Sequence, residues 1–447
     1  MNVKVSVILP SLNVADYIKE CLESVIAQTL WEIEIICVDA GSTDGTFEIL
    51  QQYAGKDTRV QIFGCEKKSY GRQVNEGIRR ANGKYIAVVE TDDFVAEEMF
   101  GKLYETAEKY SLDYVKADYD SFEELQQGGR VWQTRKTFPV RTDLYGKVIR
   151  PLDYVCVVEG DYNIWKGIYR KDFLVQKGIV LNETPGAAFQ DIGFILQTIC
   201  LAERALYTDD SFYRYRVKRK GASTYQPSAV KYLYQEFSRL LEDSTLPLGT
   251  DRQVWNRIYY KLALNFRVEY EKVLRMEQYN TDSEHLSKYY EWFCGKILYA
   301  LKKELLNLSD FGGYRMELEL LLKSGRSYAD YKYVRDKMET EPLERLREKI
   351  GERRVIIFGC GRYGKEICAI LDIHGLDVAA FCDNNQTLWG KSCYKIEVMS
   401  PEICCREYED AFFIAACRQG GEDMKRQLEG YGIHRDSIAV WPEDFRQ

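Results

Sequence analysis

The segment 88–93, VVETDD, places Glu90, Asp92 and Asp93 directly after the apolar run KYIAVV. Carboxylate oxygens suit a hard divalent cation, and a cation held by few protein groups completes its shell with other oxygens, such as those of a phosphate. An acidic cluster after a strand is also common where a strand simply ends in solvent. The segment alone therefore leaves a metal site and a solvated strand end as alternatives.

Two earlier apolar segments also end in polar residues. EIICVD ends at Asp39 and continues into Gly41 and Ser42, while VSVILP leads through Pro10 into a loop with Asn13. Asp39 could accept a hydrogen bond from a base imide or from ribose hydroxyls, and a glycine lets the backbone approach a ligand. Taken singly, an aspartate in such a position is more often part of a turn or a helix cap.

The first hundred residues alternate between two patterns that position these ends. Apolar runs at 3–10, 33–39, 59–63 and 84–90 predict strands, and helical spacing of apolar residues predicts helices at 15–28, 45–54 and 70–82. Such alternation predicts a parallel sheet covered on both faces, in which ligands bind at the carboxyl ends of the strands. The polar ends therefore predict one site, with a nucleotide base near Asp39 and a metal–diphosphate near Asp92.

Composition narrows the class of protein. A chain of 447 residues allows roughly two to four domains. A net charge of −7 argues against general nucleic-acid binding, and three histidines make a His-rich metal site unexpected. Thirteen cysteines without a C-x-x-C pair predict reduced thiols in a cytoplasmic protein, and we expect no signal peptide or membrane span. The 33 tyrosines suit either carbohydrate-facing surfaces or large cores.

Several motifs occur together in a characteristic order. VSVILPSLN, EIICVDAGSTDGT and NEGIRRANGKYIAVVETDDFV resemble the nucleotide-binding half of glycosyltransferase family 2. NIWKGIYRKDFL, FQDIGF and FYRYRVKRKGAST extend the resemblance over residues 3–225, about half the chain. The resemblance implies a GT-A fold, a nucleotide-sugar donor, a divalent metal (Mg²⁺ or Mn²⁺) and inversion at the anomeric carbon.

The resemblance also implies roles for individual residues. Asp39 would contact the base, most often uracil, and Asp92, with Asp93 beside it, would hold the metal and the diphosphate. Asp191 in FQDIGF matches the general base that takes a proton from the acceptor hydroxyl, and its place at a helix start favours the carboxylate form. Trp165 matches an aromatic residue near the acceptor, or is a core residue. The other expected donor-binding residues are Pro10, Asn13, Gly41, Ser42, Glu90, Arg216 and Ser223.

The sequence departs from the family pattern at four positions. Leu12 stands where the family often has Tyr, Ala40 replaces a second acid, and Gln190 replaces the Glu that usually precedes the base. Glu90 stands where Asp is commoner, and its extra methylene leaves direct ligation of the metal open. For Arg216 and Ser223, a solvated basic loop is as good an interpretation as closure over the diphosphate.

The last part of the chain restarts the strand–turn–helix pattern. RVIIFGCGRYGKEICAIL contains a G-x-G-x-x-G motif at Gly359, Gly361 and Gly364, and Asp383 is the acid expected about twenty residues later. This pattern resembles Rossmann-like domains and predicts binding of a nucleotide or nucleotide sugar. A structural or docking role is the main alternative, and NAD-dependent redox catalysis is a weaker one.

Together these patterns predict an α/β protein in three parts. A GT-A type, mostly parallel sheet between helices would occupy 1–227, a helical region 228–349, and a small Rossmann-like α/β domain 350–447. The expected function is that of an inverting, hexosyltransferase-like enzyme that transfers sugar to a glycan or lipid-linked acceptor in the cytoplasm or at the inner membrane face. A non-catalytic nucleotide-sugar-binding scaffold and a bifunctional enzyme with an NAD-binding domain are the alternatives. The sugar, the acceptor, the number of additions and any homo-oligomer stay open.

Overall fold

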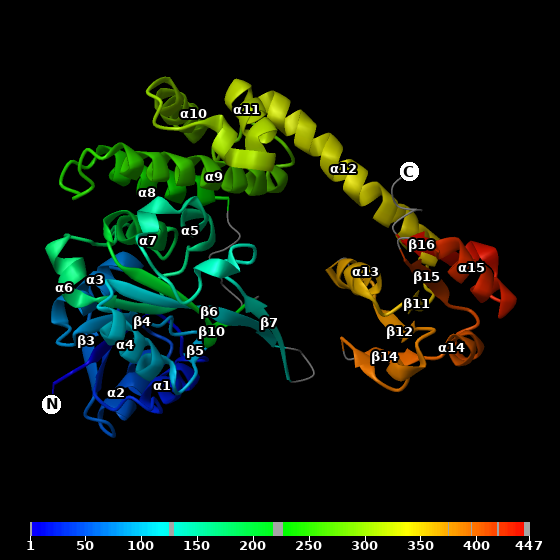
Figure 1. Cartoon of the computed structure of the whole chain (residues 1–447), viewed down its shortest axis with the longest axis horizontal. Coiled ribbons are helices and arrows are strands. Elements are labelled where there is room, and N and C mark those ends of the chain that lie inside the picture. The colour runs from blue at the N-terminus through cyan, green and yellow to red at the C-terminus, as the bar shows by residue number, and fades with distance from the viewer. Residues whose placement is uncertain are drawn as a thin grey trace. The chain divides into compact units, whose positions relative to one another are not determined.

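The structure of the protein is a computed structural model. It describes residues 2–124, 129–217, 227–373, 375–394, 396–417 and 420–441. The chain divides into two compact units, Met1–Ala329 and Asp330–Gln447, and each is considered by itself (Figure 1). The boundaries predicted at 227 and 349 stay predictions.

The first half of the N-terminal sheet contains the predicted parallel strands in the order β3-β2-β1-β4. Every residue of β1 and β2 is buried, so both faces of these strands are covered, which explains their continuous apolar sequences. The strands are β1 (Val5–Ser11), β2 (Ile33–Asp39), β3 (Val60–Gly64) and β4 (Tyr85–Val88), and the connecting helices are α1 (Ile18–Ile26), α2 (Thr46–Ala54) and α3 (Tyr70–Arg80).

The second half of this sheet is mixed. Strand β9 lies antiparallel between β4 and β6, whereas β10 runs parallel to β6 and antiparallel to β5. Since β5 directly follows the 90–93 segment, this order brings β10 to the predicted metal loop. The strands are β5 (Phe94–Val95), β6 (Tyr114–Glu124), β7 (Arg130–Arg135), β8 (Val148–Ile149), β9 (Gly167–Arg170) and β10 (Ala205–Arg216), and the helices are α4 (Met99–Tyr110), α5 (Val155–Gly160), α6 (Lys171–Gln176) and α7 (Gln190–Leu201).

The helical region that the sequence predicts is present, and its first helices belong to the first unit. On α9, Lys261 donates from Nζ to the carbonyl oxygen of Val158 (2.7 Å), and Arg257 donates from Nε to that of Leu152 (2.9 Å), so α9 is bonded to the α5 region. The helices are α8 (Ala229–Glu242), α9 (Arg252–Met276), α10 (Ser287–Lys302), α11 (Arg315–Lys323) and α12 (Gly325–Ile350).

Many tyrosines serve as core residues. The largest fully buried side chains include Tyr85, Tyr114, Tyr169, Tyr207, Tyr213, Tyr260, Tyr270 and Tyr328. A buried tyrosine needs a hydrogen-bond partner for its hydroxyl, and several of these bonds lie near the candidate site.

None of the described helices is long and apolar enough to cross a membrane.

The second unit is built on a smaller sheet in the order β13-β14-β12-β11-β15-β16, parallel except for the β13–β14 pair. Side chains of β11 alternate between two apolar clusters, one on each face of the sheet. The predicted α/β fold class is therefore confirmed, whereas the Rossmann-like character of this unit and its binding of a nucleotide stay predictions. The elements are β11 (Val355–Phe358), α13 (Arg362–Ile373), β12 (Val378–Cys382), β13 (Ser392–Cys393), β14 (Ile396–Met399), α14 (Pro401–Glu407), β15 (Phe412–Ala416), α15 (Gly421–Gly430) and β16 (Ile438–Trp441).

Candidate functional site

The turn after β2 is built around the side chain of Asp39. Its carboxylate accepts hydrogen bonds from the N–H groups of Gly41 (2.8 Å) and Ser42 (2.9 Å) and from the Ser42 hydroxyl (2.5 Å). A carboxylate offers about four acceptor positions. The described residues fill three of these, so about one position of Asp39 remains for a ligand donor.

The loop after β1 is fastened to this turn. The Asn13 N–H donates to Ser42 Oγ (2.9 Å), and Asn13 Oδ1 accepts from the Thr43 N–H (2.9 Å). Asn13 has a φ of +53°, a left-handed conformation that asparagine tolerates better than most residues. The structure thus brings Asn13, Gly41 and Ser42 together beside Asp39, because Ser11 pairs with Asp39 in the sheet register.

Two buried side chains that the sequence analysis did not single out join the strand ends. Gln73 of α3 donates from Nε2 to the carbonyl oxygens of Ser11 (2.8 Å) and Val38 (2.7 Å). The Thr91 hydroxyl donates to the Pro10 carbonyl oxygen (3.0 Å) and so ties the loop after β4 to β1. A buried carbonyl left without a donor costs about 1–3 kcal/mol, so these bonds help to fix the edge where the polar strand ends meet.

The loop after β4 is held by β10. The Tyr213 hydroxyl accepts from the Glu90 N–H (3.0 Å) and donates to Asp93 Oδ2 (2.9 Å), while Asp93 Oδ1 accepts from the Arg216 N–H (2.7 Å). Asp93 is 1% exposed, and burial, followed by the charge of Asp92, raises its pKa well above the usual range. This geometry favours Asp93 as the residue that holds the loop, and it favours Glu90 and the half-buried Asp92 as ligands for a cation.

Arg216 belongs to a cluster of four charged side chains, defined by Glu20, Glu124, Arg130 and Arg216. Its guanidinium pairs with Glu20 (2.7 Å) and with Glu124, and Arg130 pairs with the same two glutamates at 2.8 and 3.1 Å. Arg216 also donates from Nε to the Asp92 carbonyl oxygen (2.9 Å). The predicted contact of Arg216 with a diphosphate would therefore require an exchange of these carboxylate partners.

Asp191 lies in the first turn of α7, as the sequence predicts. The loop before α7 is attached to the start of α3, since the Tyr70 N–H donates to the Gly186 carbonyl oxygen (2.9 Å) and the Gly186 N–H donates to that of Lys68 (2.8 Å). Asp191 Oδ1 accepts from the Ile192 N–H (3.0 Å). The carboxylate is thereby brought to the same edge of the molecule as the strand ends.

Tyr70 connects the two acidic parts of the site. Its hydroxyl donates to Glu90 Oε1 (2.6 Å). Burial, followed by the charge of Glu90, the hydrogen bond to Glu90 and then the charge of Asp191, raises the pKa of Tyr70 well above its usual value. One partly buried tyrosine thus lies within electrostatic reach of both the candidate metal ligand and the candidate base.

Burial raises the pKa of Asp191 to about 6, against the opposing effect of main-chain hydrogen bonds and of the charges of Lys261 and Lys116. Burial lowers the pKa of each of these lysines to about 8, and Lys116 pairs with Asp161 at 2.7 Å. A carboxylate with a pKa near 6 is ionised at neutral pH and is a stronger base than an exposed aspartate. The environment of Asp191 therefore suits a general base.

The donor set at the loop after β4 fits a hard cation in part. Glu90 and Asp92 supply carboxylate oxygens, the ligands that Mg²⁺ and Mn²⁺ prefer. Among the described residues, no group of three or more His, Cys, Asp or Glu side chains could hold a metal ion alone. A cation bound here would thus take further oxygens from a ligand such as a diphosphate.

Two other candidates of the sequence analysis have simple outcomes. Trp165 is 5% exposed and stacks on Tyr213 and Tyr215, so it packs in the core. Ser223 lies outside the described residues.

In the second unit, the predicted glycine loop follows β11 and leads into α13. Gly359 has a φ of +104°, and a Cβ on Gly364 would lie 1.8 Å from the Gly359 carbonyl oxygen, so both positions require glycine. A Cβ on Gly361 would meet no atom within 4 Å. The loop thus combines a fixed backbone with open space at Gly361, which suits the approach of a phosphate.

Asp383 directly follows β12, where the sequence predicts it. Its carboxylate accepts from the N–H groups of Cys360 (2.7 Å) and Asn385 (2.8 Å), so it is bonded to the glycine loop. A cavity of about 350 Å³ beside this loop is lined in part by Lys365 and Lys391.

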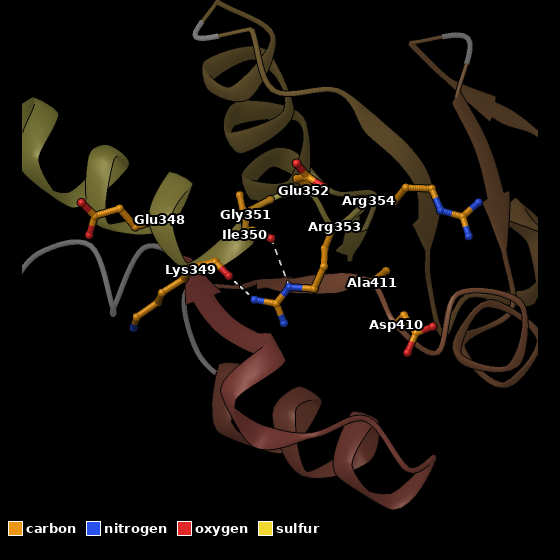
Figure 2. Close-up of a pocket in the computed structure, with 9 residues that line it drawn as sticks. All are labelled: Glu348, Lys349, Ile350, Gly351, Glu352, Arg353, Arg354, Asp410 and Ala411. Carbon is orange, nitrogen blue, oxygen red and sulfur yellow. Dashed lines mark hydrogen bonds between the residues drawn. The ribbon is translucent and has the colours of Figure 1, made fainter.

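Another cavity, of about 520 Å³, lies where β11 and β15 begin (Figure 2). Figure 2 shows the Arg353 side chain turned back to the end of α12, where Nε donates to the Ile350 carbonyl oxygen (3.1 Å). Arg353 also donates to Ser437 Oγ (2.8 Å). This cavity is separate from the glycine loop and contains none of the predicted site residues.

Comparison with known proteins gives a family match. The model described as "Glycosyl transferase family 2" matches residues 6–157. The uncharacterized glycosyltransferase YibD of Escherichia coli (strain K12) is 32% identical over 248 residues, which cover 54% of this chain and 70% of that protein. Glycosyltransferase GlyG of Streptococcus pneumoniae serotype 4 is 28% identical over 289 residues, which cover 62% of this chain and 93% of that protein.

A solved structure supports the fold. The structure of S. aureus TarS 1–349 in complex with UDP-GlcNAc aligns with a TM-score of 0.57 at 18% identity, and the alignment covers 74% of this chain and 92% of that one. At this identity the likeness shows the fold alone.

Replacing Tyr213 tests how the loop after β4 is held. Tyr213→Phe removes the donor to buried Asp93 and the acceptor for the Glu90 N–H, so we expect the free energy of unfolding to fall by about 1–3 kcal/mol. The matched control is Tyr53→Phe, which removes a surface hydrogen bond to Glu23. This substitution should change the free energy of unfolding by less than about 0.5 kcal/mol. Urea denaturation measures both, and equal losses would contradict the role of Tyr213.

Proposed function

The chain belongs to glycosyltransferase family 2, an inverting family of enzymes that use nucleotide-sugar donors, and we propose that its donor is a UDP-sugar and its acceptor a hydroxyl group of a glycan or of a lipid-linked saccharide. Its place of action would be the cytoplasm or the inner membrane face. The proposal rests on the residues gathered at the carboxyl edge of β1, β2 and β4.

The donor nucleotide would bind at the ends of β1 and β2. The remaining acceptor position of Asp39 would take the imide N–H of uracil, a bond that a cytosine N3 without a proton could not make. The ribose would lie over Gly41 and Ser42, where the backbone is already fixed by Asp39 and Asn13. The proposed donor-binding residues are Pro10, Asn13, Asp39, Gly41, Ser42, Glu90, Asp92, Arg216 and Ser223.

Asp92 would be the main protein ligand of a Mg²⁺ or Mn²⁺ ion, with Glu90 beside it. Asp93 is the second choice as a ligand, because both of its oxygens already accept hydrogen bonds. When bound, such a cation supplies positive charge next to the leaving nucleoside diphosphate.

Asp191 would act as the general base. It would accept the proton of the acceptor hydroxyl as that oxygen attacks the anomeric carbon from the face opposite the diphosphate. The bond between the anomeric carbon and the diphosphate oxygen breaks on the other side, which gives inversion. The pKa of about 6 lets Asp191 be ionised at neutral pH while it retains more basicity than an exposed aspartate.

The link made by Tyr70 is the observation that supports this proposal best. Glu90 bonds to the Tyr70 hydroxyl, and the loop that leads to Asp191 bonds to the Tyr70 N–H through Gly186. A base and a diphosphate site must lie on either side of one sugar for in-line transfer. Tyr70 joins two parts of the chain that those roles require to be neighbours.

Replacing Asp191 tests the base. With Asp191→Asn, we expect kcat for sugar transfer to fall roughly 10²- to 10⁴-fold, because the amide cannot accept the proton. The matched control is Asp172→Asn, an exposed acid in the first turn of α6, which should leave kcat unchanged. Transfer is measured by nucleotide release with a panel of nucleotide sugars, and full activity of Asp191→Asn would refute the assignment.

The pH dependence gives a second check on the same residue. Since the pKa of Asp191 is raised to about 6, the fraction of base in the carboxylate form falls as the pH drops through 6. The kcat/KM of the natural enzyme should therefore decrease tenfold per pH unit below about pH 6. The decrease below pH 6 should be missing from the residual activity of Asp191→Asn. If the protein were instead a non-catalytic scaffold, it would bind the donor but show no turnover at any pH.

Replacing Asp92 tests the cation site. We expect Asp92→Asn to raise the Mn²⁺ concentration for half-maximal donor binding at least tenfold. A tenfold change corresponds to a loss of about 1.4 kcal/mol in the free energy of cation binding. Calorimetry with the UDP-sugar at several Mn²⁺ concentrations measures this without turnover. Asp209→Asn, at an exposed position of β10, serves as the control, and equal Mn²⁺ dependence in all three proteins would exclude Asp92 as a ligand.

We further propose that the glycine loop of the second unit, with Gly359, Gly361, Gly364 and Asp383, binds a nucleotide or nucleotide sugar. The open space at Gly361 and the two cavity lysines support this proposal. Calorimetry on the full chain should then find two nucleotides per chain, and one in Gly361→Glu, whereas Gly430→Glu in an open position should keep two. A single site in the natural chain would contradict the proposal, and NAD as the second ligand would favour the bifunctional alternative.

A further inference from the structure

Two thiols meet at the cavity beside the glycine loop. Cys360 lies within the loop after β11, and Cys393 is the last residue of β13. The two side chains are close enough for the Cys360 S–H to interact with the sulfur of Cys393 as a hydrogen-bond partner. Both residues line the cavity of about 350 Å³. Cys360 is partly exposed and Cys393 is 8% exposed, so the pair is open to a small solute mainly from the side of Cys360.

A second thiol pair in the same unit lacks such access. Cys382 at the end of β12 interacts with Cys404 of α14 in the same way. Both residues are 0% exposed and lie within the apolar cluster on one face of the sheet. The unit therefore contains two thiol pairs that differ in access from the solvent.

We propose that Cys360 and Cys393 are a modification site, at which a hydroperoxide converts the two thiols into a reversible disulfide, whereas Cys382 and Cys404 stay reduced. Susceptibility of a thiol to oxidation follows its exposure and its thiolate character. The cavity whose lining includes both Cys360 and Cys393 provides this access.

The reaction begins at Cys393. Burial, followed by the interaction with Cys393, raises the pKa of Cys360 to about 12, so Cys360 stays protonated at neutral pH. The Cys393 sulfur attacks one peroxide oxygen as the O–O bond breaks, and the thiol proton passes to the leaving oxygen, which gives a sulfenic acid and one water. The Cys360 sulfur then attacks the Cys393 sulfur, loses its proton and releases the second water. Two thiols and one hydrogen peroxide thus yield one disulfide and two waters, and a dithiol reductant reverses the change.

The cross-link would change access to the cavity. It would join the glycine loop, whose Cys360 N–H is bonded to Asp383, covalently to β13 in the lining of the same cavity. The loop and β13 could then no longer separate. In the oxidised protein the entrance of the cavity would have a fixed width. This would affect the binding of any ligand that enters the cavity.

The test compares the two thiol pairs in the natural full-length chain. The chain is treated with hydrogen peroxide, unreacted thiols are blocked with N-ethylmaleimide under denaturing conditions, and peptides are analysed by mass spectrometry without reduction. We expect the Cys360–Cys393 peptide to appear at least tenfold faster than the Cys382–Cys404 peptide, and to disappear after treatment with dithiothreitol. Equal rates, or full alkylation of Cys360 and Cys393 after peroxide, would overturn the proposal.

Variants locate the first attack. In Cys360→Ser the sulfenic acid on Cys393 cannot be resolved, so dimedone should label Cys393 at least tenfold more than in the natural chain. Cys404→Ser is the matched control and should leave the Cys360–Cys393 cross-link unchanged. Dimedone labelling that falls on Cys382 rather than on Cys393 would also overturn the proposal.

Discussion

The hydroxyl group of Tyr213 is the contact on which the candidate site depends most. It accepts a hydrogen bond from the Glu90 N–H and donates one to Asp93, so it bonds β10 to the loop after β4. Without it, the buried Asp93 carboxylate would lose one of its two described donors in a region of low dielectric. This contact fixes the positions of Glu90 and Asp92 together with the bonds from Tyr70 to Glu90, from Thr91 to Pro10 and from Arg216 to the Asp92 carbonyl oxygen.

The loop after β4 and the start of α7 together carry an excess of negative charge. Glu90, Asp92 and Asp93 lie within four residues, and the charge of Asp191 acts on Tyr70, which is bonded to Glu90. Burial favours the neutral form of Asp93 and raises the pKa of Asp191 to about 6. The charge that remains suits a partner that brings a cation with it, which is how a metal–diphosphate would arrive.

The sequence predicts those parts of the site that local pattern defines. Apolar strands that end in Asp39 and Glu90, and a helix that starts at Asp191, can be recognised within a dozen residues. The bonds made by Gln73, Tyr70 and Tyr213 could not, because they join segments far apart along the chain. Nothing in the sequence separates Tyr213 from the other 32 tyrosines. The antiparallel β9 was equally hard to predict, since its four residues are too few to show a period.

The long separation between partners also has a consequence for synthesis. Asp93 and Tyr213 are 120 residues apart, and a ribosome adds about 5–20 residues each second. The acidic loop therefore leaves the ribosome roughly 6 to 24 s before the strand that bonds to it. During that interval the parallel strands β1 to β4 can already pair, but β4 has an open edge until β9 arrives. The carboxylates beside that edge keep it hydrophilic, and like-charged nascent chains repel one another there. The acids that we propose as donor-binding residues would thus also protect the growing chain from aggregation.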